Sequence, residues 1–276
     1  MLRSWRDRYG VALCPDRLLA VRRRAGLRSV VDLKVAESFA APTSGPIWKS
    51  AAEALGRFAQ QPQVHAGTLG IVLSNHFIRY LLVPWSDRIV NAHEFRNYVA
   101  AAFADVYGET SAEWELCTSP ERAGSPRLAA AVDRALIEAV RDTVGRSRLR
   151  LTSVQPYLTA AYNVFKRPRR EADFVFIAIE ARRMCVLAAQ SRMWRYVSAE
   201  ATADNPVELA ESLEREICLA GLNDETPPVV FVHAAEGSQL TLPVLLGKPP
   251  QLLNWKFPAG LSPTSDAAFV MPALTV

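Results

Sequence analysis

The spacing of hydrophobic residues predicts the same succession of elements in two parts of the chain. In the first part, three short runs rich in valine and leucine predict a three-stranded meander, at residues 9–14, 18–23 and 29–35. A helix is predicted next, with Ser44 as its N-cap and Pro46 in its first turn. Its apolar face consists of Ile47, Ala51, Leu55 and Phe58.

The second part repeats this pattern later in the chain. Three short apolar runs at residues 174–179, 184–189 and 194–197 again predict strands with tight turns between them. Asn205-Pro206 then opens a predicted helix that ends at Gly221 and buries Leu209, Leu213 and Ile217. A strand at residues 229–233 follows this helix, as one at 69–73 follows the first helix. The pattern therefore indicates a duplicated strand-strand-strand-helix-strand unit.

An additional α/β segment interrupts the first unit. A strand at residues 77–83 pairs with the run before it, and Asn91 and Glu94 form a capping box for the next helix. That helix is predicted to turn Phe95, Val99, Phe103 and Val106 inward and to stop at Gly108. Two strands, at 113–118 and 127–132, lead to a helix that is capped by Asp133 and has Leu136, Ile137, Val140 and Val144 on its apolar side. A strand at 150–154 and a short helix at 157–165 complete this part.

These patterns divide the chain into three regions. Residues 1–165 form a first half that includes the inserted subdomain at about 75–150, and residues 166–246 form a second half. The basic stretch 166–170 is predicted to link the halves. Residues 247–276 are rich in proline and have no sustained period, which predicts an irregular, largely mobile tail packed in part by Leu252, Trp255 and Phe257.

Composition favours a globular protein of the cytoplasm. Half of the 276 residues are hydrophobic, but no apolar run approaches the roughly 20 residues that span a bilayer, and the start does not resemble an export signal. The cysteines and histidines are isolated, so we expect no metal site and interpret Cys14, Cys117, Cys185 and Cys218 as buried thiols.

The net charge of +4 comes from clustered arginines. Such clusters can attract anionic lipid or nucleic acid, or can lie in solvated loops. Because aromatic residues are not interleaved with them, as a single-strand platform requires, no nucleic-acid partner is expected.

Two stretches carry a resemblance to a known family. Residues 72–85 read Val-Leu-Ser-Asn-His-Phe-Ile-Arg-Tyr-Leu-Leu-Val-Pro-Trp, an apolar strand, a polar turn and an arginine-bearing strand before a helix. Residues 149–162 contain Ser153-Val154-Gln155-Pro156 at the junction of a strand and a small-residue helix. Both resemble the pilus assembly protein PilM, the cytoplasmic domain of the type II secretion protein GspL, and MshI of mannose-sensitive pili. The resemblance implies an α/β, actin-like ATPase (ribonuclease H-like) fold made of duplicated βββαβ units with an inserted α/β subdomain.

Enzymes of that superfamily hold nucleotide with two hairpin turns and a glycine-paired turn. The first hairpin here has Pro15, which removes an N–H donor, and the second has Arg182 and Arg183 but no glycine or hydroxyl. The adenosine turn at residues 232–237 keeps one glycine. An acidic residue together with glycine at the hairpin tips would indicate activity, and we find neither there. We therefore expect no enzyme activity and no cofactor, although the arginines could bind phosphate as point charges.

The resemblance implies a bacterial, non-catalytic scaffold of a pilus or type II secretion machine, cytoplasmic or peripheral to the inner membrane. Its expected partner is a cytoplasmic peptide of an inner-membrane protein. The hairpin residues Phe77, Arg79, Tyr80 and Trp85 are candidates for that contact, unless they form a central core strand pair. The alternatives are a divergent ATP-dependent phosphotransferase and a binder of small molecules or nucleic acid. The machine served and any homo-oligomer are left open.

Overall fold

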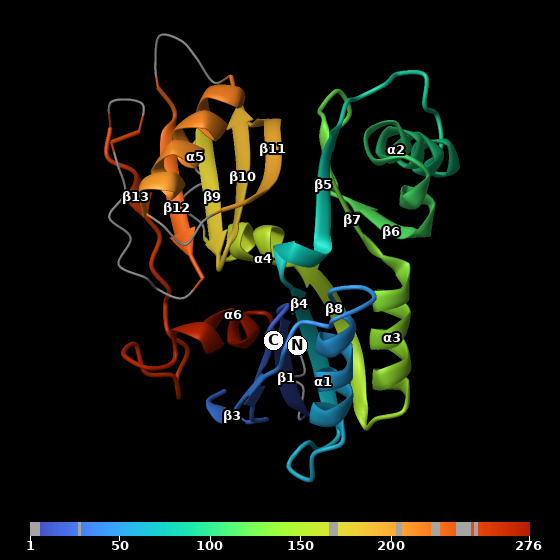
Figure 1. The fold of residues 1–276 in the computed structure, drawn as a ribbon, viewed down its shortest axis with the longest axis vertical. Coiled ribbons are helices and arrows are strands. Elements are labelled where there is room, and N and C mark those ends of the chain that lie inside the picture. The colour runs from blue at the N-terminus through green and yellow to red at the C-terminus, as the bar shows by residue number, and fades with distance from the viewer. Residues whose placement is uncertain are drawn as a thin grey trace.

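The computed structural model describes residues 6–26, 29–165, 171–202, 206–221, 227–235, 244–245 and 248–276. Its strands form three sheets, one in the lower lobe of Figure 1 and one in each of the two upper lobes. The predictions for Asn205 and for residues 166–170 lie outside the described residues.

The first sheet is the lower body of the molecule and has the strand order β3-β2-β1-β4-β8. Its elements are β1 (Asp7–Leu13), β2 (Arg17–Arg23), β3 (Val31–Ser38), α1 (Lys49–Ala59), β4 (Gly67–Leu73) and β8 (Leu149–Pro156). β1 pairs antiparallel with β2 and parallel with β4, and β4 pairs parallel with β8.

The second sheet has the corresponding order, β11-β10-β9-β12-β13. It consists of β9 (Phe174–Glu180), β10 (Arg183–Gln190), β11 (Met193–Ala201), β12 (Val229–Ala234) and β13 (Gln251–Leu252), with α5 (Pro206–Leu219) between β11 and β12. β9 pairs antiparallel with β10 and parallel with β12, as β1 does with β2 and β4. This correspondence confirms the predicted duplication of βββαβ units.

The insert forms the third sheet, with the order β5-β7-β6. Its elements are η1 (Asn75–Phe77), β5 (Ile78–Val83), α2 (Ala92–Tyr107), η2 (Glu109–Glu113), β6 (Trp114–Thr118), β7 (Arg127–Asp133) and α3 (Arg134–Gly145). α4 (Tyr157–Val164) then leads toward the second half, and η4 (Ala267–Phe269) and α6 (Val270–Leu274) come last.

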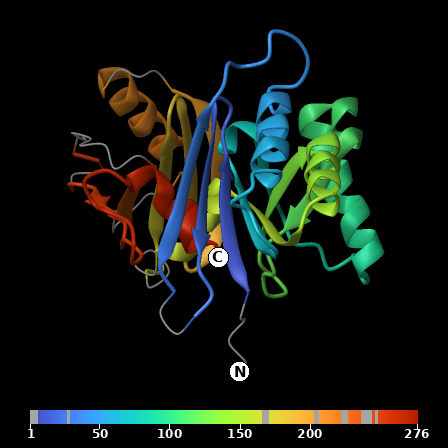
Figure 2. The same ribbon diagram turned by 90° about the horizontal axis from the view of Figure 1, so that it is seen from below.

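Helices cover both faces of the first sheet. Figure 2 shows α6 on one side of the sheet and α1 on the other, with α3 beside α1 in Figure 1. Odd-numbered residues of β1, such as Tyr9, face α1, where the Tyr9 ring meets that of Phe58 edge-on. Even-numbered residues such as Gly10 face α6. The alternation of a strand therefore supplies two different helices with their contact surfaces.

Three local predictions need correction. The first helix begins at Lys49 rather than near Ser44, with Trp48 at its N-cap position, and Ile47 is 48% exposed. The indole of Trp48 donates to the Asp133 carboxylate instead, at 2.8 Å, so tertiary contact sets this start. Val106 is 58% exposed, because α2 buries a narrower stripe that includes Val99 and Phe103.

Two further details of the predicted hairpin and helix cap also change. Phe77 belongs to the short η1 rather than to the strand, which begins at Ile78, and this strand pairs with β7 instead of with β4 as predicted. Asn91 caps α2 as predicted, by accepting from the backbone N–H groups of His93 and Glu94. The carboxylate of Glu94 accepts from the backbone of Val90, one residue earlier than in a standard capping box.

The last region confirms the predicted packing of Trp255 and Phe257, whereas Leu252 is exposed, and it packs further along the chain than the prediction of an otherwise mobile tail. β13 pairs with β12, and the Trp255 ring packs edge-on against His233 with centroids 4.2 Å apart. The chain then crosses to the first half, where the Val31 N–H donates to the Ala259 carbonyl at 2.9 Å. It ends on the first sheet in α6, so this segment connects the two halves.

Candidate functional site

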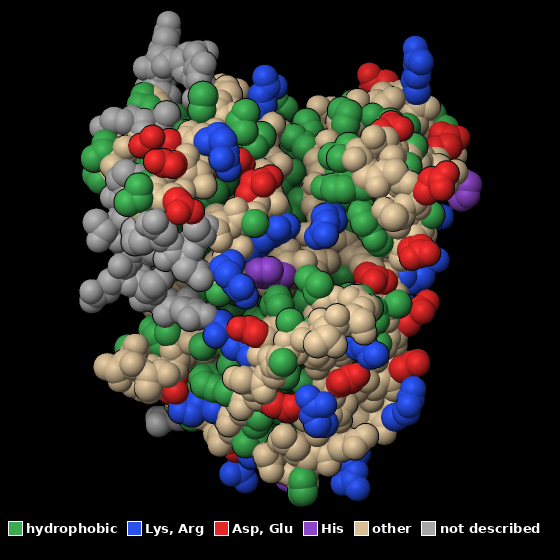
Figure 3. Space-filling view, viewed as in Figure 1, with side chains coloured by type: hydrophobic (Ala, Val, Ile, Leu, Met, Phe, Trp, Pro, Cys, Tyr) green, Lys and Arg blue, Asp and Glu red, His purple; other side chains and the backbone are tan. Residues whose placement is uncertain are grey.

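The hairpin tips of the two repeated units face each other across a cleft. The β1–β2 turn contributes Asp16 and the β9–β10 turn contributes Arg182 to the wall of a small cavity of about 50 Å³. Met271 of the C-terminal segment and Tyr157 also line this cavity. In Figure 3, Lys and Arg side chains gather where the upper lobes meet the lower one, beneath a hollow lined with hydrophobic side chains.

Glu180 is the most buried charged group of this cleft. It is the last residue of β9, is 8% exposed, and its carboxylate accepts from the Asn75 backbone N–H at 2.9 Å. Burial raises the pKa of Glu180 to about 7, because a charged carboxylate loses its hydration there. Both tips therefore carry an acidic residue, Asp16 and Glu180, which corrects the prediction that neither tip does. The sequence did contain an indication of this acidic residue, since Glu180 directly follows the apolar residues of β9.

Asn75 connects four parts of the molecule. Its side-chain oxygen accepts from the Tyr80 hydroxyl at 2.7 Å and from the Leu158 backbone N–H at 3.0 Å. These bonds link η1 to β5 of the insert and to α4, and the bond to Glu180 links it to the second half. Asn75 is fully buried. Asn75 lies inside the stretch that carries the family resemblance, but no local sequence pattern indicates this connecting role.

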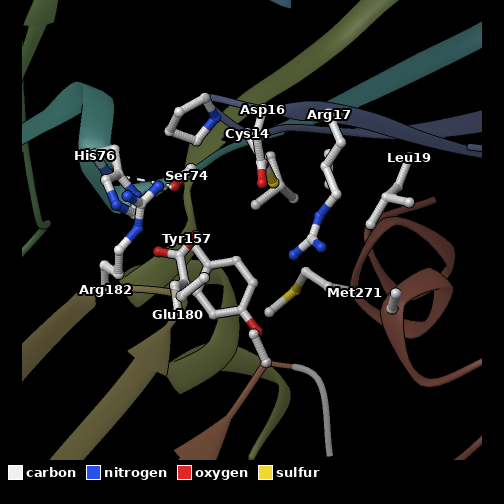
Figure 4. A pocket seen from close by; sticks show the side chains of 16 residues that line it. Cys14, Asp16, Arg17, Leu19, Ser74, His76, Tyr157, Glu180, Arg182 and Met271 are labelled. Atoms are coloured by element: carbon white, nitrogen blue, oxygen red, sulfur yellow. Dashed lines mark hydrogen bonds between the residues drawn. The ribbon is translucent and has the colours of Figure 1, made fainter. Parts of the chain in front are cut away.

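The basic groups of the cleft lie beside a neutral histidine. The guanidinium of Arg17 points into the cavity, and the side chain of Arg182 lies next to His76 (Figure 4). Burial and the nearby charges of Arg183 and Arg182 lower the pKa of His76 to about 4, and its Nδ1 lies 2.9 Å from the Ser74 hydroxyl. Arg182 has φ of +55°, a region that favours glycine. The tip thus presents an arginine where an ATPase would present backbone N–H groups.

This cleft has little room for a cofactor. Pockets for cofactors and drug-sized ligands usually measure about 300–1,000 Å³. Among the described residues, no group of three or more acidic, histidine or cysteine side chains is placed to hold a metal ion. The end of the third predicted loop, residues 236–237, lies outside the described residues.

A larger groove lies between the insert and the first sheet. β6 and β8 are edge strands of their sheets, and residues of both line a cavity of about 320 Å³. Its lining is apolar, with Leu116, Ile137 and Val154, and the Arg141 guanidinium binds the Glu115 carboxylate at 2.8 and 3.1 Å beside it. Two strand edges therefore border one apolar channel.

The groove continues toward the second half. A cavity of about 870 Å³ shares the lining residues Cys117, Ala130 and Pro156 with the cavity of about 320 Å³. Its far side carries aromatic rings, with Tyr162 edge-on to Trp194 at 5.3 Å between centroids. The Trp194 indole donates to the Glu121 carboxylate at 2.7 Å, which ties the insert to β11. We call these two joined cavities the β6 groove.

The four residues predicted to contact a partner are divided between core and surface. Phe77 and Tyr80 are buried, 6% and 5% exposed, whereas Arg79 is exposed and Trp85 is half-buried. The Trp85 indole donates to the Asp87 carboxylate at 2.7 Å. None of the four lines the described part of the β6 groove.

The prediction of four buried thiols is wrong for two of them. Cys117 and Cys218 are exposed, and Cys117 lies in the β6 groove. Cys185 is buried and Cys14 is partly buried, and burial raises the pKa of both thiols.

No protein-family model and no curated protein matches the sequence. Among solved structures, the PilM–PilN type IV pilus biogenesis complex contains a chain with a TM-score of 0.66 and 15% identity, covering 99% of this chain and 98% of that chain. The cytoplasmic domain of EpsL, from the type II secretion system of Vibrio cholerae, has a TM-score of 0.58 and 13% identity, covering 98% and 95%.

A Bacteroides thetaiotaomicron protein of unknown function with an actin-like ATPase fold has a TM-score of 0.54 and 7% identity, covering 86% of this chain and 84% of that chain. Within the described residues, no helix combines the length and the apolar character needed to cross a bilayer. The duplicated sheets and these likenesses show that the chain has the actin-like ATPase fold and shares it with PilM and the EpsL cytoplasmic domain.

Proposed function

We propose that this chain is a non-catalytic cytoplasmic component of a pilus or type II secretion machine, which docks a peptide from the cytoplasmic part of an inner-membrane protein. The observation that carries the proposal is the β6 groove, whose smaller cavity has a mainly apolar lining and is bordered by two strand edges. The structural likeness of the chain to PilM in the complex with PilN, and to the EpsL domain, supports the choice of a pilus or type II secretion machine.

The β6 groove suits an extended peptide. An edge strand offers unpaired N–H and C=O groups to an added strand, and pockets beside it take alternate side chains. β6 has five residues and so spans about 16 Å. Apolar side chains of the peptide would enter the space around Leu116 and Val154, and the larger cavity beside Trp194 would take a bulky end.

The groove is tested by filling it at Cys117. Cys117→Trp should weaken binding of a cytoplasmic peptide from the native inner-membrane pilus or secretion proteins by at least about tenfold, because the indole occupies the channel. Cys218→Trp, at another exposed cysteine on α5, should bind like the wild type. The measurement is fluorescence titration of labelled peptides after both variants are shown to be folded.

A second measurement uses the native thiols. A bound peptide should slow alkylation of Cys117 several-fold and leave that of Cys218 unchanged, since only Cys117 lies in the β6 groove. If Arg79→Glu abolishes binding while Cys117→Trp does not, the partner contacts β5 instead. If no such peptide binds the wild type, the scaffold proposal fails.

The proposal that the cleft is inactive predicts no effect of ATP. Millimolar ATP with magnesium should leave the melting temperature unchanged, because a ligand stabilises the fold only in proportion to its binding. Pro15 lacks an N–H, Arg182 occupies the second tip and the cavity measures about 50 Å³. Inorganic triphosphate serves as the control for plain anion binding by the arginines. A rise of several degrees with ATP but not with triphosphate would favour the divergent phosphotransferase.

A further inference from the structure

The face of the first sheet that carries α6 has a row of arginines at the end remote from the cleft. In the register of the sheet, Arg23 of β2 lies opposite Arg8 of β1, Arg8 is level with Thr68 of β4, and Thr68 is level with Arg150 of β8. Residues level with one another on neighbouring strands point to the same face. The row therefore presents Arg23, Arg8 and Arg150 together, and it is called the arginine row below.

α6 does not cover this row. The helix has five residues and contacts the sheet one level nearer the cleft, at Gly10, while Thr275 and Val276 after it lie over Gly70. Arg150 is exposed, and Arg8 and Arg23 are half-buried. Arg23 donates from Nη1 to the backbone oxygens of Ala273 in α6 and of Val276 after it. Arg8 donates to the Ser29 hydroxyl at 3.1 Å.

No acidic side chain of the described residues pairs with the arginine row. None of the ion pairs found among them includes Arg8, Arg23 or Arg150. Like charges directly opposite on neighbouring strands repel, and burial and the charge of Arg8 lower the pKa of Arg23.

The other face of the same sheet shows the contrast. Arg22, the neighbour of Arg23 in β2, points toward α1. Its guanidinium binds the Asp32 carboxylate through two hydrogen bonds of 2.9 Å, and the Asp7 carboxylate lies 3.9 Å away. The sequence thus supplies acidic side chains to the arginine on the face of α1 and, in the described part of the chain, supplies none to the row on the face of α6.

We propose that the arginine row binds the phosphate headgroups of an anionic lipid bilayer. The row runs straight across four hydrogen-bonded strands, about 14 Å from Arg23 to Arg150, and none of the cavities described above includes it. A level line of guanidinium groups fits a planar array of phosphates, since each guanidinium can bind phosphate oxygens in pairs. The inference rests on the proposed function for the presence of a membrane nearby, and it adds direct lipid contact to the docking of a partner peptide.

The test is flotation with vesicles of phosphatidylethanolamine and phosphatidylglycerol, with vesicles of phosphatidylcholine as the neutral reference. Wild-type protein should bind the anionic vesicles alone and should be released in about 1 M salt, where charges act over about 3 Å. Arg8→Gln/Arg150→Gln should bind roughly 30-fold more weakly, since each arginine near the surface contributes about a fivefold gain. Arg23 is retained in this variant because it also contacts α6.

The matched control is Arg57→Gln/Arg146→Gln, which removes the same charge from exposed arginines of α1 and of the end of α3. It should bind nearly as well as the wild type. Equal weakening by both double variants would show that net charge and not the row is responsible, and would overturn the proposal. So would binding of the wild type to phosphatidylcholine, or complete competition by millimolar inorganic phosphate.

Binding to a short DNA duplex with the same dependence on Arg8 and Arg150 would overturn the choice of lipid. Peptide binding in the β6 groove is measured on the same variants and should be unchanged, because neither Arg8 nor Arg150 lines either cavity of the groove. If Arg8→Gln/Arg150→Gln loses vesicle binding and retains peptide binding, both proposals are supported. Retained peptide binding without any vesicle binding of the wild type removes the lipid proposal and leaves the scaffold.

Discussion

Gly10→Ala should destabilise the protein by about 3 kcal/mol or more and release α6 from the first sheet. An added Cβ at Gly10 would overlap the carbonyl oxygen of Pro272 and lie 2.6 Å from its carbonyl carbon, closer than real Cβ atoms approach. Both groups are backbone, so neither can turn away. The helix must move, and it then exposes Val270 and Met271, which are 0% and 3% exposed. Burying such a side chain contributes about 1.5–3 kcal/mol.

Urea denaturation gives the free energy of unfolding, and limited proteolysis between Trp255 and α6 reports whether the segment has come loose. Gly56→Ala is the matched control, because Gly56 lies in α1 with no atom within 4 Å of an added Cβ. Alanine there should stabilise by up to about 1 kcal/mol, since glycine is the poorer helix former. If Gly10→Ala unfolds at the wild-type midpoint, α6 does not pack against β1 as described.

The repeated strands and the main helices could be predicted because their patterns are local. The two faces of a strand alternate with a period of two residues, and the apolar stripes of α3 and α5 follow the helical period. Leu136, Leu213 and the other predicted core residues of these helices are buried accordingly. The duplicated plan indicated the actin-like fold, residues 72–85 and 149–162 carried the resemblance to PilM and GspL, and the structural likenesses agree with that fold.

The C-terminal segment could not be predicted, because its order depends on distant partners. α6 has five residues and contains Pro272, so neither propensity nor period identifies it. Its position follows from Gly10 and Gly70, which let a backbone approach the sheet, and from the Lys34–Asp266 ion pair at 2.9 Å. These residues are more than 200 positions apart, as the separation of 232 between Lys34 and Asp266 illustrates.

For the candidate sites too, local patterns located single elements, whereas the contacts between distant elements could not be predicted. The hairpin tips were located from the sequence, but the inward position of Glu180 and its bond to Asn75 depend on how the two halves meet. The β6 groove joins β6 to β8, which have no pairing with each other that a local pattern could reveal. The partner residues predicted in and beside β5 stay a prediction, and the β6 groove offers a second place to test.

Glu180→Gln should make the protein more stable than the wild type near neutral and at alkaline pH. Burial raises the pKa of Glu180 from 4.5 to about 7, so the folded state keeps a proton that the unfolded chain releases at lower pH. This contribution to stability is fully present below about pH 4.5 and is lost as the pH rises to about 7. A shift of this size corresponds to about 3 kcal/mol at most. Glutamine is neutral at every pH, and its side-chain oxygen can still accept from the Asn75 N–H.

The measurement is the difference in free energy of unfolding between Glu180→Gln and the wild type across this range. The difference should be small near about pH 4 and should grow in favour of the variant until about pH 7, then level off. Burial lowers the pKa of His76 and of His233 to about 4, so these two residues reduce the stability of the fold as the pH falls. Both the variant and the wild type contain them, and their effect therefore cancels in the difference between the two proteins. A variant that is less stable at about pH 8 would contradict the prediction. The hydrogen bonds and nearby arginines would then outweigh burial, and the cleft would hold a charged carboxylate, as a phosphotransferase requires.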